Sequence, residues 1–502
     1  MIFSAIQHYA TATPDKIALK GQDQQISYAQ LTHEVARVKH YLQVAKPKVL
    51  AIAMDNGPAW AMLDLAALIL GLANVPLPLF FSAEQLCHAI QDAQVDFLVT
   101  DKPILFAKLL TESGVLIGER YDYFLSGKLI TAFKVVASGT HHTMPAQTAK
   151  ITYTSGTTGK PKGVCLSAAS MAQVAQSLRL ATAASANDRH LSILPYSTLL
   201  ENLAGLYVPL LAGATTVCLP LESVGLSGSS GFNPQKFLQT ILREKPSSLI
   251  LTPELLLALV SLIEEGATKP ENLRFIAVGG ASVSPLLLNR AEKIGLPVFE
   301  GYGLSECASV VALNTPTTKK IGSVGKPLAH VNLHFNEENE IFVSGAQYLG
   351  YLEQAESMQQ TVATGDIGYM DEDGFLHITG RKKNIFISSY GRNVSPEWVE
   401  RELTLSPLIG QAAVFGEAKP FNVAVIVTKQ NVSAEALAND IEKINQALPD
   451  YARVRNYLLA DVPFSVANNQ RTANGRLRRA EIFQHYQIAI EDLYQGKTYA
   501  TV

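Results

Sequence analysis

Residues 153–163 read Tyr153-Thr154-Ser155-Gly156-Thr157-Thr158-Gly159-Lys160-Pro161-Lys162-Gly163, a run of glycines, hydroxyls and lysines. Glycines let backbone N–H groups approach an anion, hydroxyls donate further hydrogen bonds, and lysines supply mobile positive charge. The alternative is a surface loop without a ligand, as for any short glycine-rich motif. The two lysines favour a loop that binds a polyphosphate.

The spacing within this run excludes a P-loop of the nucleoside triphosphatases. A P-loop has four residues between its first glycine and its Gly-Lys pair, and then Ser or Thr. Here only two residues separate Gly156 from Gly159-Lys160, and Pro161 would interrupt the helix that a P-loop opens. The run instead resembles the phosphate-binding signature of the acyl-adenylate-forming superfamily, which includes acyl-CoA synthetases, adenylation domains of peptide synthetases and firefly luciferase.

Composition limits the class of protein and its partners. The chain has 502 residues, a net charge of -3 and an apolar fraction of 47%, so we expect several structural units and no nucleic acid partner. The 4 cysteines lack a metal-ligand pattern and suit a reducing cytoplasm. The start of the chain does not read as a secretory signal, and glycine and prolines interrupt the apolar stretch 63–81. We expect a cytoplasmic protein without a transmembrane segment, and peripheral membrane contact stays open.

The pattern of apolar residues predicts an α/β fold. Short β-like runs at 49–54, 95–100, 191–194, 249–251 and 275–278 alternate with helical segments, which indicates layered α/β subdomains with largely parallel sheets. Between about residues 322 and 379, turns separate strand-like pieces and predict a small β-rich subdomain. We expect a large N-terminal domain at 1–381 that binds ATP and the acyl group, and a small mobile α+β domain at 382–502.

A second motif, Gly301-Tyr302-Gly303-Leu304-Ser305-Glu306, resembles the superfamily segment in which an aromatic ring stacks on adenine, a hydroxyl contacts phosphate and a carboxylate holds magnesium. A hard cation between Glu306 and phosphate oxygens would neutralise charge as the α-phosphorus is attacked. Ser305 keeps the hydroxyl of the threonine that most members have. The resemblance also implies that Gly279-Gly280-Ala281, after a predicted strand, lies on the adenine side. Each segment alone could be an ordinary turn.

Four further positions take their roles from the resemblance. Asp366 and Arg381 match the pair that contacts the ribose hydroxyls. Lys383 falls at the hinge about which the C-terminal domain rotates, and Gly391 falls in the loop beside the pantetheine arm of the acceptor thiol. A β-turn residue or a surface lysine would look the same in the sequence.

Arg476 departs from the superfamily pattern. It stands where members normally have a lysine that bridges the substrate carboxylate and the α-phosphate. A guanidinium is broader, planar and more weakly hydrated than an ammonium, so adenylation is expected to be slower or to use a shifted geometry. Loss of catalysis, leaving a nucleotide- or acyl-binding protein, is the alternative.

Residues 194–207 occupy the place where members begin their acyl pocket. Amino-acid-activating relatives place an aspartate in this vicinity to hold the substrate ammonium, and this segment has none. Its apolar residues, with Ala204 and Gly205, favour a fatty acid, although each could simply be helix core. Glu201 could cap the helix, lie at the rim of an acyl tunnel or contact a polar part of the substrate.

We therefore expect a Mg²⁺-dependent ligase that joins a carboxylic acid to CoA through acyl-AMP, and the sequence favours a fatty acid. The cofactors expected are ATP, Mg²⁺ and CoA or the phosphopantetheine of a carrier protein, with an acyl carrier protein as an alternative partner. An oxygenase of the luciferase type is disfavoured, because nothing in the sequence predicts oxygen chemistry. The expected catalytic residues are Thr157, Lys160, Ser305, Glu306 and Arg476, with Glu306 as metal ligand. The expected nucleotide- and CoA-binding residues are Thr154, Ser155, Gly156, Thr158, Gly159, Lys162, Gly279, Gly280, Ala281, Tyr302, Gly303, Asp366, Arg381, Lys383 and Gly391.

Overall fold

The computed structural model describes residues 1–136, 143–154, 161–228, 231–352, 361–390, 392–429, 432–472 and 475–495. Contact density divides them into two units. The first unit comprises Met1–Gly280, Ala291–His334 and Phe342–Val362. The second comprises Ala281–Arg290, Phe335–Ile341 and Ala363–Val502.

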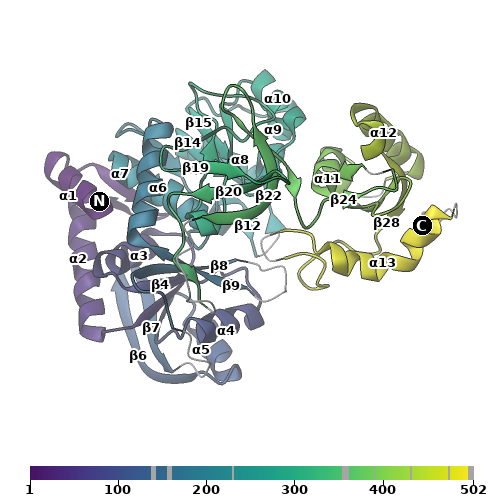
Figure 1. The fold of residues 1–502 in the computed structure, drawn as a ribbon. Helices are drawn as coiled ribbons and strands as arrows, with labels where there is room; N and C mark the ends of the chain where they lie inside the picture. Colours follow the sequence, from purple (N-terminus) through teal and green to yellow (C-terminus); the bar gives the residue numbers. More distant parts are fainter. Residues whose placement is uncertain are drawn as a thin grey trace. The chain divides into compact units, whose positions relative to one another are not determined.

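Two large sheets form the frame of the first unit (Figure 1). Sheet A has the strand order β18 (Lys326–Pro327), β17 (Ala312–Leu313), β16 (Val298–Tyr302), β15 (Phe275–Val278), β14 (Ser248–Leu251), β10 (Arg189–Leu191), β11 (Thr215–Val217), β1 (Ile17–Lys20) and β2 (Gln25–Ser27). Sheet B has the order β21 (Gly350–Tyr351), β9 (Lys162–Ser167), β8 (Thr148–Thr154), β4 (Ala73–Pro76), β3 (Val49–Ala53), β5 (Phe97–Thr100), β7 (Lys128–Val136) and β6 (Leu116–Leu125). The inner strands of each sheet run parallel and the outer ones antiparallel.

Helices cover these sheets and supply the apolar core of the first unit. They are α1 (Ile2–Ala12), α2 (Tyr28–Ala45), α3 (Pro58–Leu70), α4 (Ala83–Asp92), α5 (Pro103–Glu112), α6 (Ala168–Ala181), α7 (Val208–Ala212), α8 (Pro234–Glu244) and α9 (Pro253–Glu264). A π-helix at Glu201–Tyr207 continues directly into α7, and a short hairpin pairs β12 (Leu226–Ser227) with β13 (Gly231–Phe232).

Helix α3 lies at the centre of this core. Its residues from Pro58 to Ala67 are all buried, as expected for a helix that is apolar on every side. Proline stands at its first turn, and Gly71 ends it with φ 63°, a conformation that glycine adopts without strain. The stretch 63–81 is therefore a core helix followed by strand β4, as its sequence predicts.

A four-stranded sheet follows along the chain, with the order β19 (Asn332–Phe335), β20 (Glu340–Ser344), β22 (Val362–Met370) and β23 (Leu376–Arg381) among the described residues. Helix α10 (Pro285–Lys293) precedes it in sequence. This sheet matches the β-rich subdomain expected between residues 322 and 379.

The second unit contains a mixed sheet in the order β26 (Ile409–Phe415), β27 (Asn422–Thr428) and β28 (Val454–Leu459). Helices α11 (Pro396–Thr404) and α12 (Ala434–Ala447) pack on one face and α13 (Arg479–Tyr494) on the other. Side chains alternate between the faces as in any strand: Val414 and Ile426 join the first cluster, and Ala413 and Val425 join the second. A short ribbon pairs β24 (Phe386–Ile387) with β25 (Asn393–Val394).

The expected α/β class, with a large N-terminal and a smaller C-terminal domain, is confirmed. By contacts, Ala363 and the residues after it belong to the second unit. The domain boundary expected at residue 382 stays a prediction. The strand expected at 191–194 lies at Arg189–Leu191, and strand β15 has the predicted bounds. Among the helices of the described residues, none is long and apolar enough for a bilayer crossing.

Candidate active site

The ends of the glycine-rich run are held side by side at one edge of sheet B. Thr154 is the last residue of β8 and pairs with Lys162, the first residue of β9. Residues Ser155, Gly156, Thr157, Thr158, Gly159 and Lys160 lie outside the described residues. Of the predicted phosphate loop, the structure therefore describes the two flanking strands.

Helix α4 contacts both of these strands, a feature that the sequence does not reveal. The Tyr153 hydroxyl donates to Asp92 at 2.6 Å, and His88 Nε2 donates to the Pro161 carbonyl at 2.9 Å. Asp92 and His88 lie one turn apart on the same face of α4. The helix thus fixes the positions at which the glycine-rich run leaves β8 and enters β9.

The two glycine motifs of sheet A lie next to each other at the carboxyl ends of adjacent parallel strands. Gly279 follows β15, and a Cβ there would come within 3.0 Å of the carbonyl oxygen of Gly301 in β16. Gly280 has φ +82°, which favours glycine. A Cβ on Gly303 would lie 1.6 Å from the Ser309 carbonyl oxygen, so no larger residue fits without a backbone shift. Ligands of open α/β sheets bind at such edges.

Glu306 is joined to the β9 side of the phosphate run through Tyr351. The carboxylate lies in a 3₁₀ turn, Ser305–Cys307, and its Oε1 accepts from the Tyr351 hydroxyl at 2.8 Å. Tyr351 is in β21, which pairs with β9, and Lys162 Nζ lies 5.5 Å from the centre of its ring. Burial, together with the charge of Glu306, raises the pKa of the Tyr351 hydroxyl, so it stays a donor. The structure thus brings the predicted metal ligand and Lys162 to the same tyrosine.

This arrangement fits a magnesium ion that is shared with phosphate. Within the described ranges, no group of three His, Cys, Asp or Glu side chains could hold a metal on its own. Mg²⁺ in nucleotide sites takes one or two carboxylates and completes its shell with water and phosphate oxygens. Glu306, half-buried beside the ends of the phosphate run, is a donor of this kind.

In the second unit, the expected ribose pair is assembled. Asp366 in β22 and Arg381 in β23 are directly opposite each other, and Arg381 Nε lies 2.7 Å from Asp366 Oδ1. The Asp366 side chain is 3% exposed and the Arg381 side chain 40%, so the guanidinium keeps access to solvent.

The other predicted residues of this unit are at its surface. Ala281, Lys383 and Arg476 are exposed, and Gly391 lies outside the described residues. Arg476 closes a turn with Thr472. The Arg476 N–H donates to the Thr472 hydroxyl at 3.0 Å, and the Thr472 N–H donates to the Arg476 carbonyl at 2.7 Å. Nothing in the sequence predicts this turn.

Residues 194–207, the expected acyl segment, contain the π-helix, which is a rare form that often marks functional sites. Glu201 is fully buried and accepts from the Leu194 N–H at 3.2 Å, while its other oxygen lies 3.0 Å from His190 Nε2. A Cβ on Gly205 would come within 2.1 Å of the Glu201 carboxylate. Glu201 therefore lies at neither a tunnel rim nor a solvent-exposed cap; it joins the acyl segment to sheet A.

A buried charge pair holds the same segment to sheet B. Lys150 in β8 donates to Asp64 in α3 at 2.7 Å, and both side chains are at most 2% exposed. Asp64 also accepts from the Tyr207 hydroxyl at 2.6 Å and from Asn202 at 3.1 Å. Burial lowers the pKa of Lys150, and the charge of Asp64 opposes that shift. β8, which leads to Thr154, is thereby tied to the π-helix.

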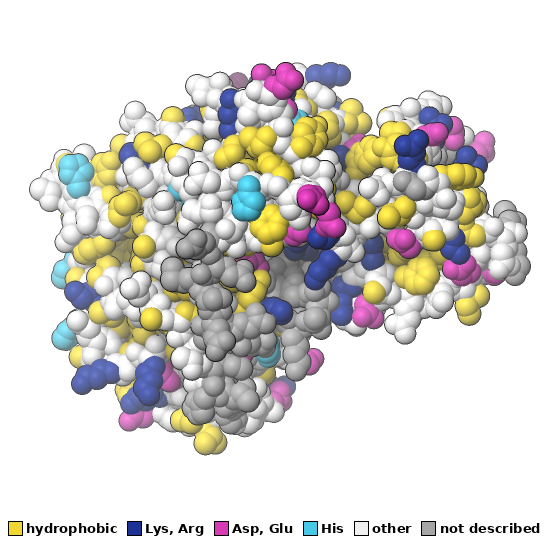
Figure 2. Space-filling view, viewed as in Figure 1, with side chains coloured by type: hydrophobic (Ala, Val, Ile, Leu, Met, Phe, Trp, Pro, Cys, Tyr) yellow, Lys and Arg dark blue, Asp and Glu magenta, His cyan; other side chains and the backbone are white. Residues whose placement is uncertain are grey.

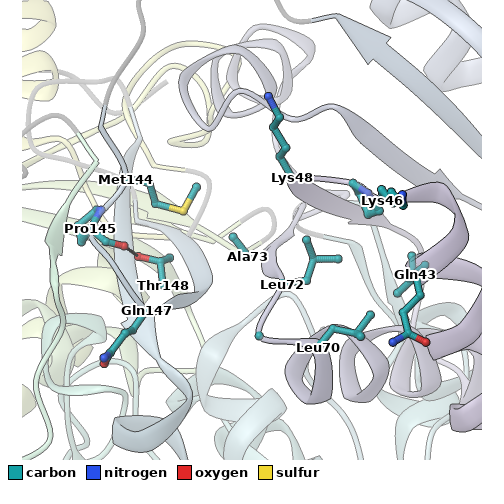
Figure 3. Close-up of a pocket in the computed structure, with 13 residues that line it drawn as sticks. Gln43, Lys46, Lys48, Leu70, Leu72, Ala73, Met144, Pro145, Gln147 and Thr148 are labelled. Atoms are coloured by element: carbon teal, nitrogen blue, oxygen red, sulfur yellow. Dashed lines mark hydrogen bonds between the residues drawn. The ribbon is translucent and has the colours of Figure 1, made fainter.

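A separate cavity of about 450 Å³ opens at the amino ends of β4 and β8 (Figure 3). Leu70 and Leu72 line one side and Met144 and Pro145 the other. Thr154 ends β8 at its opposite, carboxyl end, so this cavity is distinct from the phosphate run. On the face in Figure 2, Lys and Arg side chains are interspersed with Asp and Glu.

The sheet-edge glycines, the glycine-rich run and the carboxylate beside it define a nucleotide-binding α/β enzyme. Residues 6–352 match the AMP-binding enzyme family, and residues 383–498 match the AMP-binding enzyme C-terminal domain. The chain belongs to the AMP-binding enzyme family, and the superfamily predicted from the sequence is confirmed.

Two curated relatives and one solved structure show how far the similarity extends. The 2-succinylbenzoate–CoA ligase of Bacillus subtilis (strain 168) is 30% identical, over 81% of this chain and 83% of its own length. The long-chain-fatty-acid–CoA ligase FadD15 of Mycobacterium bovis is 27% identical, over 87% and 86%. The solved Bacillus subtilis O-succinylbenzoate coenzyme A synthetase, in complex with ATP and magnesium ion, superposes with a TM-score of 0.73 at 26% identity, covering 95% of this chain and 98% of that one.

Proposed function

We propose that the chain is an AMP-forming acyl-CoA ligase. In the first half-reaction a substrate carboxylate oxygen attacks the α-phosphorus of ATP, which forms acyl-AMP and releases pyrophosphate. In the second, the thiol of CoA loses its proton, attacks the acyl carbon and displaces AMP. The observation that carries this proposal is the arrangement of Glu306 and Lys162 around Tyr351, beside the two strands that flank the glycine-rich run.

The residues around the nucleotide would act by charge and by position. When bound at Glu306, Mg²⁺ supplies positive charge to phosphate oxygens. Lys160, Thr157 and the other residues of the run would bind the phosphates, with the Ser305 hydroxyl as a further donor. Tyr302 would stack on the adenine base beside Gly279 to Ala281. Asp366 and Arg381 would contact the ribose.

Arg476 would contact the substrate carboxylate and the α-phosphate, in the role that the family gives to lysine. Lys383 would be the hinge of a C-terminal domain at 382–502, and Gly391 would lie beside the pantetheine arm. The solved relatives named as coenzyme A synthetases support CoA over a carrier protein as the acceptor.

A fatty acid, or another acid with one carboxylate and an apolar body, is the proposed substrate. The acyl segment has no lysine or arginine of its own, and the neighbouring basic side chains are already paired, Lys150 with Asp64 and Arg189 with Glu244. Glu201 is bonded within the protein. The segment therefore offers little to a second carboxylate or to an ammonium group.

A second candidate is an aromatic dicarboxylic acid of the 2-succinylbenzoate type, which two kinds of comparison favour. Its additional carboxylate would need a basic group from outside residues 194–207. The chain is similar to CoA ligases for fatty acids and to CoA ligases for 2-succinylbenzoate. This similarity supports the type of reaction more strongly than it supports either acid as the substrate.

The experiment is pyrophosphate release from Mg-ATP with a panel of long and medium fatty acids, benzoate, 2-succinylbenzoate and amino acids, each with and without CoA. The expected result is the highest kcat/KM with fatty acids and accumulation of the acyl-CoA. Preference for 2-succinylbenzoate would establish the second candidate. Pyrophosphate without thioester would point to a carrier protein as acceptor, and inactivity with every acid would contradict the ligase.

A further inference from the structure

Strand β6 is an open edge of sheet B, at the end of its strand order (Figure 1). It has 10 residues, and among the described residues no strand pairs with its outer side. Most of its side chains are exposed, Leu116 and Phe124 at 69% each. An open edge of this length is a template for pairing with another chain.

The turn that joins β6 to β7 determines which backbone groups of β6 face outward. Ser126 and Gly127, with φ 55° and 68°, form the two-residue loop of a type I′ hairpin, which makes Leu125 and Lys128 a hydrogen-bonded pair. Hydrogen-bonded pairs alternate along an antiparallel ladder. The N–H and C=O groups of Arg120, Asp122 and Phe124 therefore point to the open side.

One observed contact agrees with this direction. The Phe124 carbonyl accepts from Arg37 Nη2 at 3.4 Å, from a side chain of α2 and not from β7. This bond is long and exposed, and the Arg37 side chain is 55% exposed. A partner strand could therefore replace it at little cost.

If the partner strand is a second copy of β6, charge favours the register centred on Tyr121 over those centred on Arg120 or Asp122. An antiparallel pair centred on Tyr121 sets Arg120 opposite Asp122 of the other copy, and Asp122 opposite its Arg120. A pair centred on Arg120 would set the two copies of Arg120 opposite each other, and a pair centred on Asp122 would do the same for Asp122. Like charges directly opposite each other destabilise a strand pair. Arg120 and Asp122 already lie on one face, with Nη2 and Oδ2 3.0 Å apart.

The side chains beyond this central pair are also compatible. Phe124 would lie towards the bulge that contains Gly118 of the other copy, where an added Cβ would meet only atoms of Lys134, at 3.5 Å or more. The exposed ring would thus cover a position without a side chain. Charged side chains often block an edge, but Arg120 and Asp122 carry opposite charges two residues apart, so two copies of this edge can pair them.

We propose that two copies of this chain associate through β6, paired antiparallel about a two-fold axis at Tyr121. The dimer joins two sheets B into one continuous sheet. The pairing is expected along 120–122 and its neighbours, because a bulge between Ile117 and Arg120 interrupts the ladder beyond them.

Sedimentation velocity of the full chain over a range of concentrations tests the proposal, with charge-reversed variants as probes. Arg120→Asp and Asp122→Arg should each weaken dimerisation by roughly tenfold or more, because both set like charges opposite each other twice. The double variant restores opposite charges and should dimerise like the parent. Adenylate formation is the check on folding, since β6 lies outside the proposed active site.

Three results would overturn the proposal. A chain that stays monomeric at every concentration has no such interface. A dimer that neither single variant weakens uses another surface. A monomer that binds vesicles of anionic lipid through this hairpin would assign β6 and β7 to a membrane surface.

A cross-link tests the register itself. Tyr121 would be a non-hydrogen-bonded pair with itself, at a Cα separation of about 4.5 Å, so Tyr121→Cys should form an intermolecular disulfide on oxidation. Phe124→Cys is the control: Phe124 is more exposed than Tyr121, at 69% against 38%, but its two copies would lie about 20 Å apart. The parent's cysteines are buried or half-buried. Equal cross-linking of both variants, or of neither, would contradict the register.

Discussion

Tyr351 donates to Glu306 while its ring faces Lys162, so a single phenol positions the carboxylate next to a cation. The hydroxyl donates to one oxygen of the carboxylate and leaves other lone pairs for a metal. Glu306 would therefore contribute to metal binding through its position as well as through its charge.

Glu306→Gln should lower the rate of adenylate formation by about 10² to 10³, because an amide is a poor ligand for Mg²⁺ and neutralises less charge. The Mg²⁺ concentration for half-maximal rate should rise. Tyr351→Phe, which removes only the hydroxyl, should cost roughly tenfold. Stopped-flow pyrophosphate release at varied Mg²⁺ measures both.

Glu112→Gln provides the control, since that carboxylate is 66% exposed on α5. It should leave the rate and the Mg²⁺ dependence unchanged. A Glu306→Gln enzyme with the parent's Mg²⁺ dependence would show that Glu306 is not the metal ligand.

At the scale of elements, the Lys150–Asp64 pair links β8, α3 and the π-helix across the core of the first unit. Two buried charges cost solvation, and good geometry with further hydrogen bonds offsets that cost. Removal of one partner leaves the other charge uncompensated.

Lys150→Met should destabilise the first unit by about 3 to 5 kcal/mol, whereas Lys108→Met, at a side chain 72% exposed, should change stability by less than about 0.5 kcal/mol. Adding Asp64→Asn to Lys150→Met should recover part of the loss, because the buried charge is gone. Urea unfolding in a Trp398→Phe background, with Trp60 as the remaining tryptophan, measures these values. Full additivity of the two substitutions would argue against a charge pair.

The sequence predicts those elements whose pattern is local. Strand β15 is an apolar run between polar turns, and its predicted bounds are the observed ones. The hairpin of β6 and β7 was not predicted, because β6 is exposed on most of its length and lacks the alternation of a half-buried strand. The π-helix was not predicted either, since its extra residue per turn leaves no sequence period.

In the candidate site, too, the sequence predicts the residues that lie in local motifs and misses those that only the fold brings together. Glu306 and the Asp366–Arg381 pair stand out because motifs surround them. Tyr351 and His88 could not be found, because their partners are distant along the chain and only the pairing of β21 with β9 and the packing of α4 bring them together.

At the scale of the whole molecule, each unit has its own apolar core. Within the second unit, Glu400 is buried and bonds Arg479 as well as the Val414 N–H, at 2.8 Å. Burial raises the pKa of Glu400 from 4.5 to about 6, and the charge of Arg479 opposes that shift.

The second unit should therefore become more stable as pH falls from 7 to 4.5 at this site, by roughly 2 kcal/mol. A carboxyl with a raised folded pKa holds its proton more tightly when folded, so its contribution is complete below pH 4.5 and is lost as pH rises through about 6. The free energy of unfolding is measured at each pH for the parent and for Glu400→Gln, both in a Trp60→Phe background. The fluorescence of Trp398, in α11, then reports the second unit, and the difference between the two proteins is the contribution of Glu400. A pH-independent difference between parent and variant would contradict the raised pKa.

We propose that this chain activates a carboxylic acid through acyl-AMP and passes the acyl group to CoA. A single-turnover reaction with Mg-ATP, a long-chain fatty acid and CoA, quenched at intervals and resolved by mass spectrometry, follows both steps. We expect acyl-AMP to rise and then decay as acyl-CoA and AMP appear in equal amounts, and Glu306→Gln to slow the first phase. Formation of ADP and phosphate, or acyl-CoA without AMP, would contradict it.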